Sequence, residues 1–285
     1  MTAHLREIVE EHLAGLRFTH DPAVAGLEEA MRYSLLAGGK RIRPVLALAT
    51  ARAIGTEPSD VLPAAAALEL IHTYSLIHDD LPAMDDDELR RGRPTSHVVH
   101  GEDVAILAGD GLFAEAINLI SQRQEAAADR VVAALATLTA ATGVDGMVGG
   151  QYVDVSAADL DAEGLRRLHE LKTGRLIAAS VEIPLILAGA SEPDTIGYRR
   201  FAAELGVLFQ IVDDILDVTG DEEQLGKPQG SDERHGKRTY VSVFGLDQAR
   251  ELAAESHRKA REALAEAGGA DRLGQITDYI LTRQT

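Results

Sequence analysis

The sequence predicts an all-α fold in a single domain that spans residues 1–285. Almost every long segment has the apolar period of a helix, and convincing alternating strands are missing. Alanine and leucine are plentiful, whereas aromatic residues make up 4% and tryptophan is absent. This composition favours helices packed on helices over sheets. Linker-like shifts in composition and low-complexity tracts are also missing, which favours one domain.

The elements follow from apolar periodicity between glycine and proline breaks. The breaks fall at 37–39, 55–58, 81–82, 92–94 and 220–227. Helices are expected near 3–16, 21–37, 41–54, 61–80, 102–121, 125–150, 162–189, 194–219 and 246–284.

Composition also excludes several classes of function. The net charge of −18 argues against a nucleic-acid partner and against docking on an anionic membrane. The absence of cysteine excludes disulfides, thiol nucleophiles and zinc-thiolate sites. The first residues, MTAHLREIVEEHL, form an acidic amphipathic pattern and not a signal peptide. No apolar run reaches the ~18 residues of a membrane span, so we expect a soluble, cytoplasmic protein without stable membrane insertion.

An acidic cluster follows the expected helix 61–80. Asp79 and Asp80 precede Pro82, and the acidic run 85–88 comes next. Carboxylates this close repel one another by roughly 1 to 4 kcal/mol per pair at about 4 Å. A fold that holds them together is expected to bind Mg²⁺ or Ca²⁺, the cations that prefer oxygen ligands. A solvated acidic loop is the alternative at this point.

A second acidic cluster occurs near the end of the expected helix 194–219. Gln210, Asp213, Asp214 and Asp217 fall at i, i+3, i+4 and i+7, which is one face of a helix. Apolar residues fill the other faces, so the helix should be largely buried and its polar stripe should face a cavity, a partner or a metal. Aspartates at a helix C-terminus also oppose the helix dipole, which favours a functional interpretation.

The helix before the first cluster carries a similar stripe of His72, Ser75 and Asp79. An ordinary buried histidine is the alternative for His72, although its alignment with Asp79 favours a site. His78 has no such alignment and is interpreted as structural.

Basic residues occur next to both acidic clusters. The segment GGKRIRP at 38–44 is a glycine-rich turn that leads into a helix start, where backbone N–H groups favour an anion. Lys172-Thr173-Gly174 interrupts an apolar helix, and a buried lysine there needs a counter-charge. Arg90, Arg91, Lys227 and Lys237 lie near the clusters. Interleaved acids and bases of this kind are typical of a site for Mg²⁺ and a phosphate-rich ligand.

Taken together, these segments resemble the trans-isoprenyl diphosphate synthases, and most of all the bacterial short-chain farnesyl diphosphate synthase group. The resemblance covers nearly the whole chain. It rests on GGKRIRP (38–44), HTYSLIHDDLPAMDDDELRRGRPT (72–95), LAGDGLF (107–113), GGQYVD (149–154), KTG (172–174), FQIVDDILDVTGD (209–221) and LGKPQGSD (225–232).

The resemblance implies about ten or more helices around a deep central cavity, in a homodimer. It implies head-to-tail condensation of an allylic diphosphate with isopentenyl diphosphate. Three Mg²⁺ ions are expected with the allylic diphosphate, two on Asp79 and Asp85 and one on Asp213. Asp80, Asp86, Asp214 and Asp217 would act in the outer shell. Arg90, Lys172, Thr173, Gln210, Lys227 and Lys237 would contact the allylic diphosphate or its carbocation. Lys40, Arg43, His72 and Arg91 would bind isopentenyl diphosphate.

The same resemblance implies that residues just before the first motif, Tyr74 and Ser75, set the product length. Tyr74 lies five residues before Asp79, about 7.5 Å along a helix, and its ring could block a longer chain. Ordinary core packing is the alternative role. We therefore expect farnesyl diphosphate as product, with geranyl or geranylgeranyl diphosphate as alternatives. A non-catalytic prenyl-diphosphate-binding subunit and a terpene cyclase are the rival functions. The intact aspartate motifs disfavour the first, and Lys40, Arg43 and His72 disfavour the second.

Overall fold

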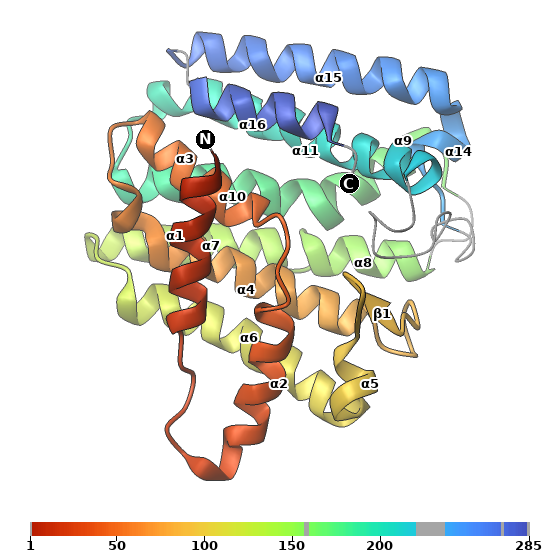
Figure 1. The fold of residues 1–285 in the computed structure, drawn as a ribbon. Helices are drawn as coiled ribbons and strands as arrows, with labels where there is room; N and C mark the ends of the chain where they lie inside the picture. The colour runs from red at the N-terminus through yellow and green to blue at the C-terminus, as the bar shows by residue number, and fades with distance from the viewer. Residues whose placement is uncertain (1, 157–159, 221–236, 269–270, 284–285) are drawn as a thin grey trace.

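The structure, a computed structural model, describes the chain except residues 1, 157–159, 221–236, 269–270 and 284–285. It confirms the all-α prediction (Figure 1). The α-helices are α1 (Thr2–Gly15), α2 (Ala25–Leu35), α3 (Ile42–Ala53), α4 (Leu62–Asp79), α5 (Ser96–His100), α6 (Glu102–Arg123), α7 (Ala128–Thr142), α8 (Met147–Ser156), α9 (Ala162–His169), α10 (Arg175–Ala188), α11 (Glu192–Thr219), α14 (Tyr240–Phe244), α15 (Leu246–Glu266) and α16 (Asp271–Thr282). Short elements are η1 (Pro22–Val24), η2 (Pro58–Val61), the π-helical η3 (Glu170–Gly174), β1 (Leu89–Arg90) and β2 (Arg93–Pro94).

Helix α4 lies at the centre of the molecule, packed against α3, α6 and α10 (Figure 1). Its first half contains a run of four buried alanines, Ala64 to Ala67, which lets the neighbouring helices approach closely. Helix α11 packs on α10 on one side and on α15 on the other. The C-terminal ends of α4 and α11, which carry the two acidic clusters, therefore both belong to the core of the bundle.

Two of the expected helices are each divided in the structure, so those two predictions were wrong in detail. The segment 125–150 forms α7 and α8, separated by a turn from Gly143 to Gly146. A Cβ at Gly146 would lie 2.2 Å from the Ala141 carbonyl oxygen, so this tight turn requires glycine. The segment 246–284 forms α15 and α16, and Gly268 after α15 has a φ of 95°. Apolar periodicity continues through both turns, which is why the sequence pattern did not reveal them.

A two-residue hairpin connects the first acidic cluster to α5. Leu89 pairs with Pro94 and Arg90 with Arg93. The turn residues Arg91 and Gly92 both have a positive φ, as tight hairpin turns require. Strands this short carry no readable alternation, so the sequence pattern did not predict them.

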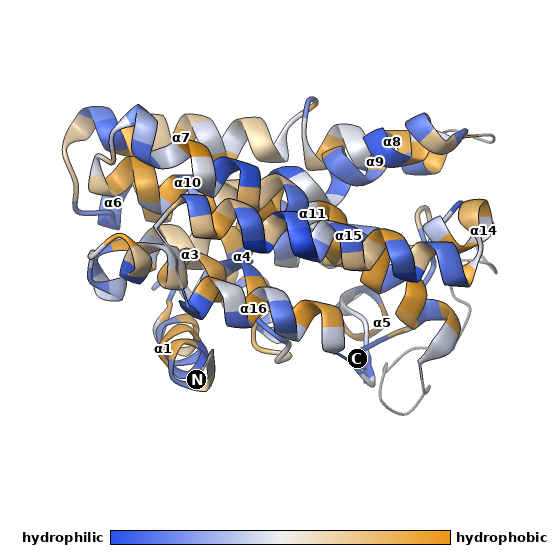
Figure 2. Cartoon of the chain, turned by 90° about the horizontal axis from the view of Figure 1, so that it is seen from above, coloured by the Kyte–Doolittle hydropathy of each residue, from blue (hydrophilic) through white to orange (hydrophobic). Residues whose placement is uncertain are grey.

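Helices α6, α7 and α8 lie along one long edge of the molecule (Figure 2). By length and composition alone, Glu102–Arg123 and Ala128–Ser156 are apolar enough to cross a membrane. The second stretch is interrupted by the turn at Gly143, and core helices of soluble proteins meet the same criterion. Of the most apolar 18-residue window in each stretch, 39% and 33% is buried, and Leu107 and Val132 are exposed apolar residues on these helices.

Candidate active site

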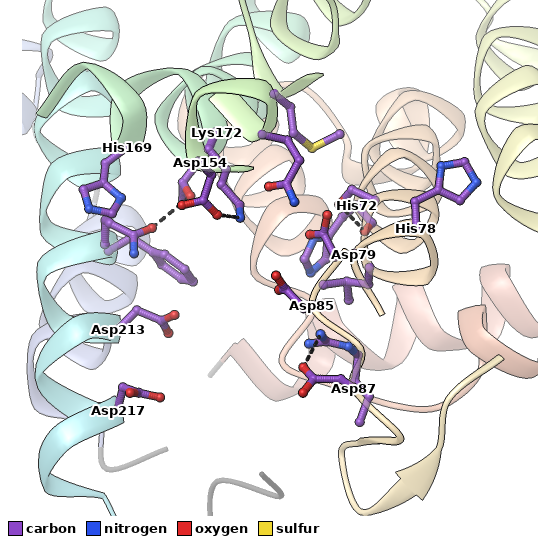
Figure 3. Close-up of a pocket in the computed structure, with 18 of the residues that line it drawn as sticks. His72, His78, Asp79, Asp85, Asp87, Asp154, His169, Lys172, Asp213 and Asp217 are labelled. Atoms are coloured by element: carbon purple, nitrogen blue, oxygen red, sulfur yellow. Dashed lines mark hydrogen bonds and ion pairs between the residues drawn. The ribbon is translucent and has the colours of Figure 1, made fainter. Parts of the chain in front are cut away.

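A cavity of about 960 Å³ opens between the C-terminal half of α4, α8, η3 and α11 (Figure 3). It brings together sixteen residues that were singled out from the sequence. These are Lys40, Arg43, His72, Tyr74, Ser75, Asp79, Asp85, Arg90, Arg91, Lys172, Thr173, Gln210, Asp213, Asp214, Asp217 and Lys237. Asp80 and Asp86 do not line the cavity, and Lys227 lies outside the described residues.

The first acidic motif is placed by the end of α4. Asp79 is the last residue of the helix, and the chain then turns so that the Asp85 backbone N–H donates to the Asp79 carbonyl oxygen at 2.9 Å. Both carboxylates lie at the cavity wall (Figure 3). Burial raises the pKa of Asp79, and the nearby negative charge of Asp85 adds to this rise against the pull of Lys172. A cation between them would stabilise the ionised form of Asp79.

Asp80 has a different environment from Asp79. Its carboxylate is buried and accepts a hydrogen bond from Arg90 Nε at 2.7 Å. Burial raises the pKa of Asp80 to about 6, although Arg90 opposes this rise. The pair fixes Arg90 on the hairpin, with its guanidinium between Asp80 and the cavity. Asp80 therefore acts on the site through Arg90.

The second acidic motif forms a stripe along α11. Gln210, Asp213, Asp214 and Asp217 all border the cavity, as their spacing predicts. Asp213 is the exposed member, and Arg283 Nη2 lies 3.2 Å from its Oδ1. Asp214 is buried and accepts hydrogen bonds from Gln210 Nε2 at 2.8 Å and from the Tyr240 backbone N–H at 2.7 Å. Asp214 thus holds Gln210 and α14 in place, while Asp213 faces the opening.

An alternating chain of charges joins the two sides of the cavity mouth. Lys237 Nζ donates to Asp85 Oδ2 at 2.8 Å and lies 3.8 Å from Asp154 Oδ2. Asp154, on α8, also accepts a hydrogen bond from Lys172 Nζ at 2.6 Å. Lys172 therefore has the counter-charge that a buried lysine in an apolar helix was expected to need.

The backbone around Lys172 departs from a regular α-helix. Residues 170–174 form the π-helical segment η3, and such segments are frequent at functional sites. A Cβ at Gly150 would lie 2.3 Å from the Lys172 backbone nitrogen, so glycine lets α8 approach η3 closely. The Thr173 hydroxyl donates to Gln210 Oε1 at 2.9 Å. This places two neutral oxygen dipoles at the centre of the cavity wall.

Positive charge is concentrated in a second group of residues on the cavity wall, which forms its basic end. Lys40 comes from the turn before α3 and Arg43 from the first turn of α3, and Arg91 donates to the Gly38 carbonyl oxygen and stacks on Gly39. Burial lowers the pKa of Lys40 to about 8 and that of Arg43 to about 10, because the nearby negative charges do not offset the cost of burying these cations. Within the described part of the chain, the buried Nε of Arg43 has no hydrogen-bond partner. This end of the cavity therefore fits an anion.

His72 borders the same end. Burial lowers its pKa well below the ordinary value, and Arg43 lowers it further. The imidazole is consequently neutral near pH 7, and it can offer one N–H donor to an anion without adding a charge. His78 also borders the cavity, but its Nε2 lies 3.0 Å from the Ile106 carbonyl oxygen of α6, which agrees with its structural interpretation.

Tyr74 and Ser75 lie further down α4, on the apolar side of the cavity. The Tyr74 ring makes edge-on contacts with His78 and Phe113, with centroid distances of 5.8 Å and 5.5 Å. Burial raises the pKa of Tyr74 to about 12, so its hydroxyl stays neutral. Ser75 donates its hydroxyl proton to the His72 carbonyl oxygen.

The donor set at the mouth fits Mg²⁺. Asp79, Asp85 and Asp213 offer only oxygen ligands, and the raised pKa of Asp79 reflects its burial first and the negative charge of Asp85 second. No three carboxylates or imidazoles among the described residues converge on one point. This arrangement suits Mg²⁺ that is held by one or two carboxylates and completed by phosphate oxygens, rather than an all-protein cage.

Sequence reasoning missed four polar residues that complete the site. Arg283 comes from the end of α16 and lies over the Phe209 ring, at 4.4 Å from its centroid. His169 stacks on Tyr240 at the cavity wall. Asp154 and Glu69 supply counter-charges to basic residues. Asp154 stood in the quoted GGQYVD segment, whereas no local pattern marks Arg283, because its contact with α11 joins residues about seventy positions apart.

Comparisons with known proteins agree with this geometry. The polyprenyl synthetase family model matches residues 24–273. The farnesyl diphosphate synthase of Geobacillus stearothermophilus is 47% identical over 273 residues, covering 91% of this chain and 89% of the relative. The chloroplastic geranylgeranyl pyrophosphate synthase of Capsicum annuum is 46% identical over 263 residues, covering 90% of this chain and 71% of the relative.

Solved structures show the same fold. A geranyltransferase from Helicobacter pylori, complexed with magnesium and isoprenyl diphosphate, has a TM-score of 0.86 at 33% identity, covering 98% of this chain and 94% of that one. An FPP/GFPP synthase from Zymomonas mobilis has a TM-score of 0.85 at 33% identity, covering 99% and 100%. The paired aspartate motifs, the fold and the family match over most of the chain lead to one conclusion: the protein belongs to the polyprenyl synthetase family of prenyltransferases.

Proposed function

We propose that this protein condenses isopentenyl diphosphate with dimethylallyl and geranyl diphosphates to give farnesyl diphosphate. The observation that carries the proposal is one cavity whose wall holds carboxylates at its mouth and a separate group of cations, Lys40, Arg43 and Arg91, at its basic end. A diphosphate that must leave needs strong neutralisation, whereas a diphosphate that is retained needs only a binding site. The two groups of residues match these two requirements.

The allylic substrate is assigned to the mouth. Asp79, Asp85 and Asp213 would hold Mg²⁺, three ions in all, and the bound metal would neutralise the diphosphate so that the allylic C–O bond ionises. Lys172, Lys237 and Arg90 would take the remaining phosphate oxygens. In this arrangement Lys237 exchanges its contact with Asp85 for a contact with the substrate.

Isopentenyl diphosphate is assigned to the basic end, where Lys40, Arg43 and Arg91 bind its diphosphate and neutral His72 donates a hydrogen bond. Its alkene then attacks the allylic cation, a new C–C bond forms, and the released pyrophosphate takes the proton. The side-chain oxygens of Thr173 and Gln210 stabilise the cation through their dipoles. The apolar wall below them excludes water, which would otherwise capture it.

The proposed farnesyl product rests on Tyr74 as the floor of the tail pocket. Its ring is held by Phe113 and His78 and lies about 7.5 Å along α4 from Asp79. The relatives include both farnesyl and geranylgeranyl diphosphate synthases, so product length is decided by measurement.

One incubation tests the proposal: purified protein with Mg²⁺, labelled isopentenyl diphosphate and each allylic starter, followed by chromatography of the products. Fifteen-carbon product from both starters supports it, and twenty-carbon or ten-carbon product would replace the farnesyl assignment. Asp79→Ala and Asp213→Ala should lower kcat by roughly 10²–10³-fold, with unchanged circular dichroism. Absence of turnover by the unaltered protein would instead favour a non-catalytic subunit.

We also propose that two copies associate through the edge formed by α6 and α7. Leu107 on α6 and Val132 on α7 are 54% and 64% exposed, and neither lines the cavity. Ile106 on α6 and Val144 in the turn after α7 are further exposed apolar residues outside the cavity lining. An exposed apolar surface of this kind marks an interaction site. Leu107→Asp should yield monomers in light scattering, whereas Tyr279→Asp, on the exposed part of α16, should leave the dimer intact.

The acidic surface, with a net charge of −18, would keep such a dimer away from anionic membranes. We therefore propose that the enzyme is cytoplasmic.

A further inference from the structure

The turn that carries Lys40 and leads into α3, where Arg43 is the second residue, has a strained backbone. Arg41, which follows Lys40, has φ 53° and ψ 37°, the left-handed conformation that is unfavourable for residues with a Cβ. Arg41 stands directly before α3 and makes no side-chain cap to that helix. Something other than local propensity must therefore hold this conformation.

The Arg41 side chain holds this conformation, because it is fully buried and forms hydrogen bonds to three other segments of the chain. Its Nη1 donates to Glu69 Oε1 at 2.6 Å, its Nε to Glu10 Oε1 at 3.0 Å, and its Nη2 to the Leu35 carbonyl oxygen at 2.7 Å. These contacts tie the turn to α1, to the end of α2 and to the middle of α4 at once.

Glu69 is the buried partner in this network. Its side chain is 2% exposed, compared with 33% for Glu10, and it lies one helical turn before His72 on α4. It also borders the basic end of the cavity, beside Arg43. A free carboxylate there would repel a diphosphate, so its pairing with Arg41 is a condition for anion binding at this end.

The remaining cations are then directed at the cavity. Arg41 is neutralised by Glu69 and Glu10, while Lys40, Arg43 and Arg91 line the cavity. The unsatisfied buried Nε of Arg43 points to a ligand that has yet to bind. The backbone conformation of Arg41 sets how Lys40 and the start of α3, which carries Arg43, lie relative to each other.

We propose that Glu69 is a positioning residue for the diphosphate that is retained in the reaction: by holding Arg41 in its left-handed conformation, Glu69 directs Lys40 and Arg43 at that diphosphate. This inference rests on the proposed function, since it takes isopentenyl diphosphate as the occupant of the basic end. Glu69 itself does not touch the substrate.

Glu69→Gln tests the proposal. The amide keeps the size of the side chain and one oxygen acceptor but removes the charge that holds Arg41. The KM for isopentenyl diphosphate should rise roughly tenfold or more, the loss expected when a charge-assisted hydrogen bond is weakened. The KM for geranyl diphosphate and kcat at saturating isopentenyl diphosphate should each change by less than about twofold, because the mouth of the cavity is untouched.

Two further variants keep the test decisive. Glu10→Gln removes the half-exposed partner, so it should fold readily and give a smaller rise in the same KM. Glu182→Gln weakens the ion pair between Glu182 on α10 and Arg199 on α11, neither of which lines the cavity, and should leave both KM values unchanged.

The outcomes separate the inference from the function on which it rests. An equal rise in both KM values, a fall in kcat alone, or an unchanged KM for isopentenyl diphosphate in folded Glu69→Gln would overturn the positioning role. If Glu69→Gln does not fold, an unchanged KM in Glu10→Gln would overturn it. Lack of turnover by the unaltered protein would refute the proposed function instead.

Discussion

Removal of the Tyr74 ring is the sharpest perturbation of product length that the structure offers. The ring lies below the first acidic motif and is enclosed by His78 on its own helix and by Phe113 on α6. Tyr74→Ala would extend the apolar end of the cavity toward Phe113. Under the proposed role of Tyr74 as floor, a growing chain could then extend past its position.

The energetic consequences follow from burial. Truncating a fully enclosed aromatic side chain costs about 3–5 kcal/mol, and each edge-on ring contact contributes roughly 0.5–1.5 kcal/mol of specific stabilisation. Tyr74 is 8% exposed but borders the cavity, so the space it leaves is continuous with solvent or substrate. We therefore expect Tyr74→Ala to lower the free energy of unfolding by about 3 kcal/mol, near the lower end of this range. A large all-helical domain should remain folded after such a loss.

The assay is chain-length analysis of products made from dimethylallyl diphosphate and excess isopentenyl diphosphate. Fifteen-carbon product should give way to twenty-carbon or longer product, while the initial rate of the first condensation stays within a few-fold. A folded Tyr74→Ala protein with an unchanged product distribution would refute the role of Tyr74 as floor and leave ordinary core packing.

Tyr198→Ala is the matched control for this experiment. Tyr198 is an equally buried tyrosine on α11 that does not line the cavity. Its truncation should lower the melting temperature without lengthening the product. Longer products from Tyr198→Ala would show that general loosening, and not removal of the floor, changes chain length.

Three other predictions test the rest of the site. Because the ammonium form of Lys40 binds the anion and its pKa is lowered to about 8, kcat/KM for isopentenyl diphosphate should fall as the pH rises through about 8. Lys40→Arg should move that fall to higher pH, and an identical profile would exclude Lys40 as its source. His72→Ala should raise the KM for isopentenyl diphosphate roughly tenfold with little change for the allylic substrate; an equal loss for both would indicate a structural role. Gly150→Ala should cost about 1–3 kcal/mol in denaturant unfolding, because its Cβ would meet the Lys172 backbone, whereas Gly26→Ala, with open space around it, should be neutral or slightly stabilising.

The sequence predicted the parts of the site whose geometry is local. The stripe from Gln210 to Asp217 needs only the helical period, and the need of Lys172 for a counter-charge follows from its apolar surroundings. Both expectations are confirmed by the structure. Local rules fail where a residue is placed by a distant part of the chain. Asp80 resembles Asp79 in sequence, yet the hairpin brings Arg90 to it and turns it away from the cavity.

Helix ends show the same limit. Apolar periodicity survives through the turns at Gly143 and Gly268, so the pattern alone predicts helices that are too long. The π-helical form of η3 could not be read from the sequence either, nor could the close approach of α8 to it at Gly150. In each case a glycine was visible, but its effect was decided by the neighbouring backbone.

The asymmetry of the cavity lining supports the proposed difference between the two diphosphates. At the mouth, Asp79 and Asp85 contribute negative charge, so the proposed function requires Mg²⁺ for a diphosphate to bind there. At the basic end, Lys40 and Arg43 border the cavity, while Glu69 and Glu10 both pair with Arg41. Under the proposed assignment, metal charge would favour departure of the diphosphate at the mouth, and the substrate at the basic end would keep its diphosphate and react through its alkene. The direction of chain growth would then follow from which group of residues binds which substrate.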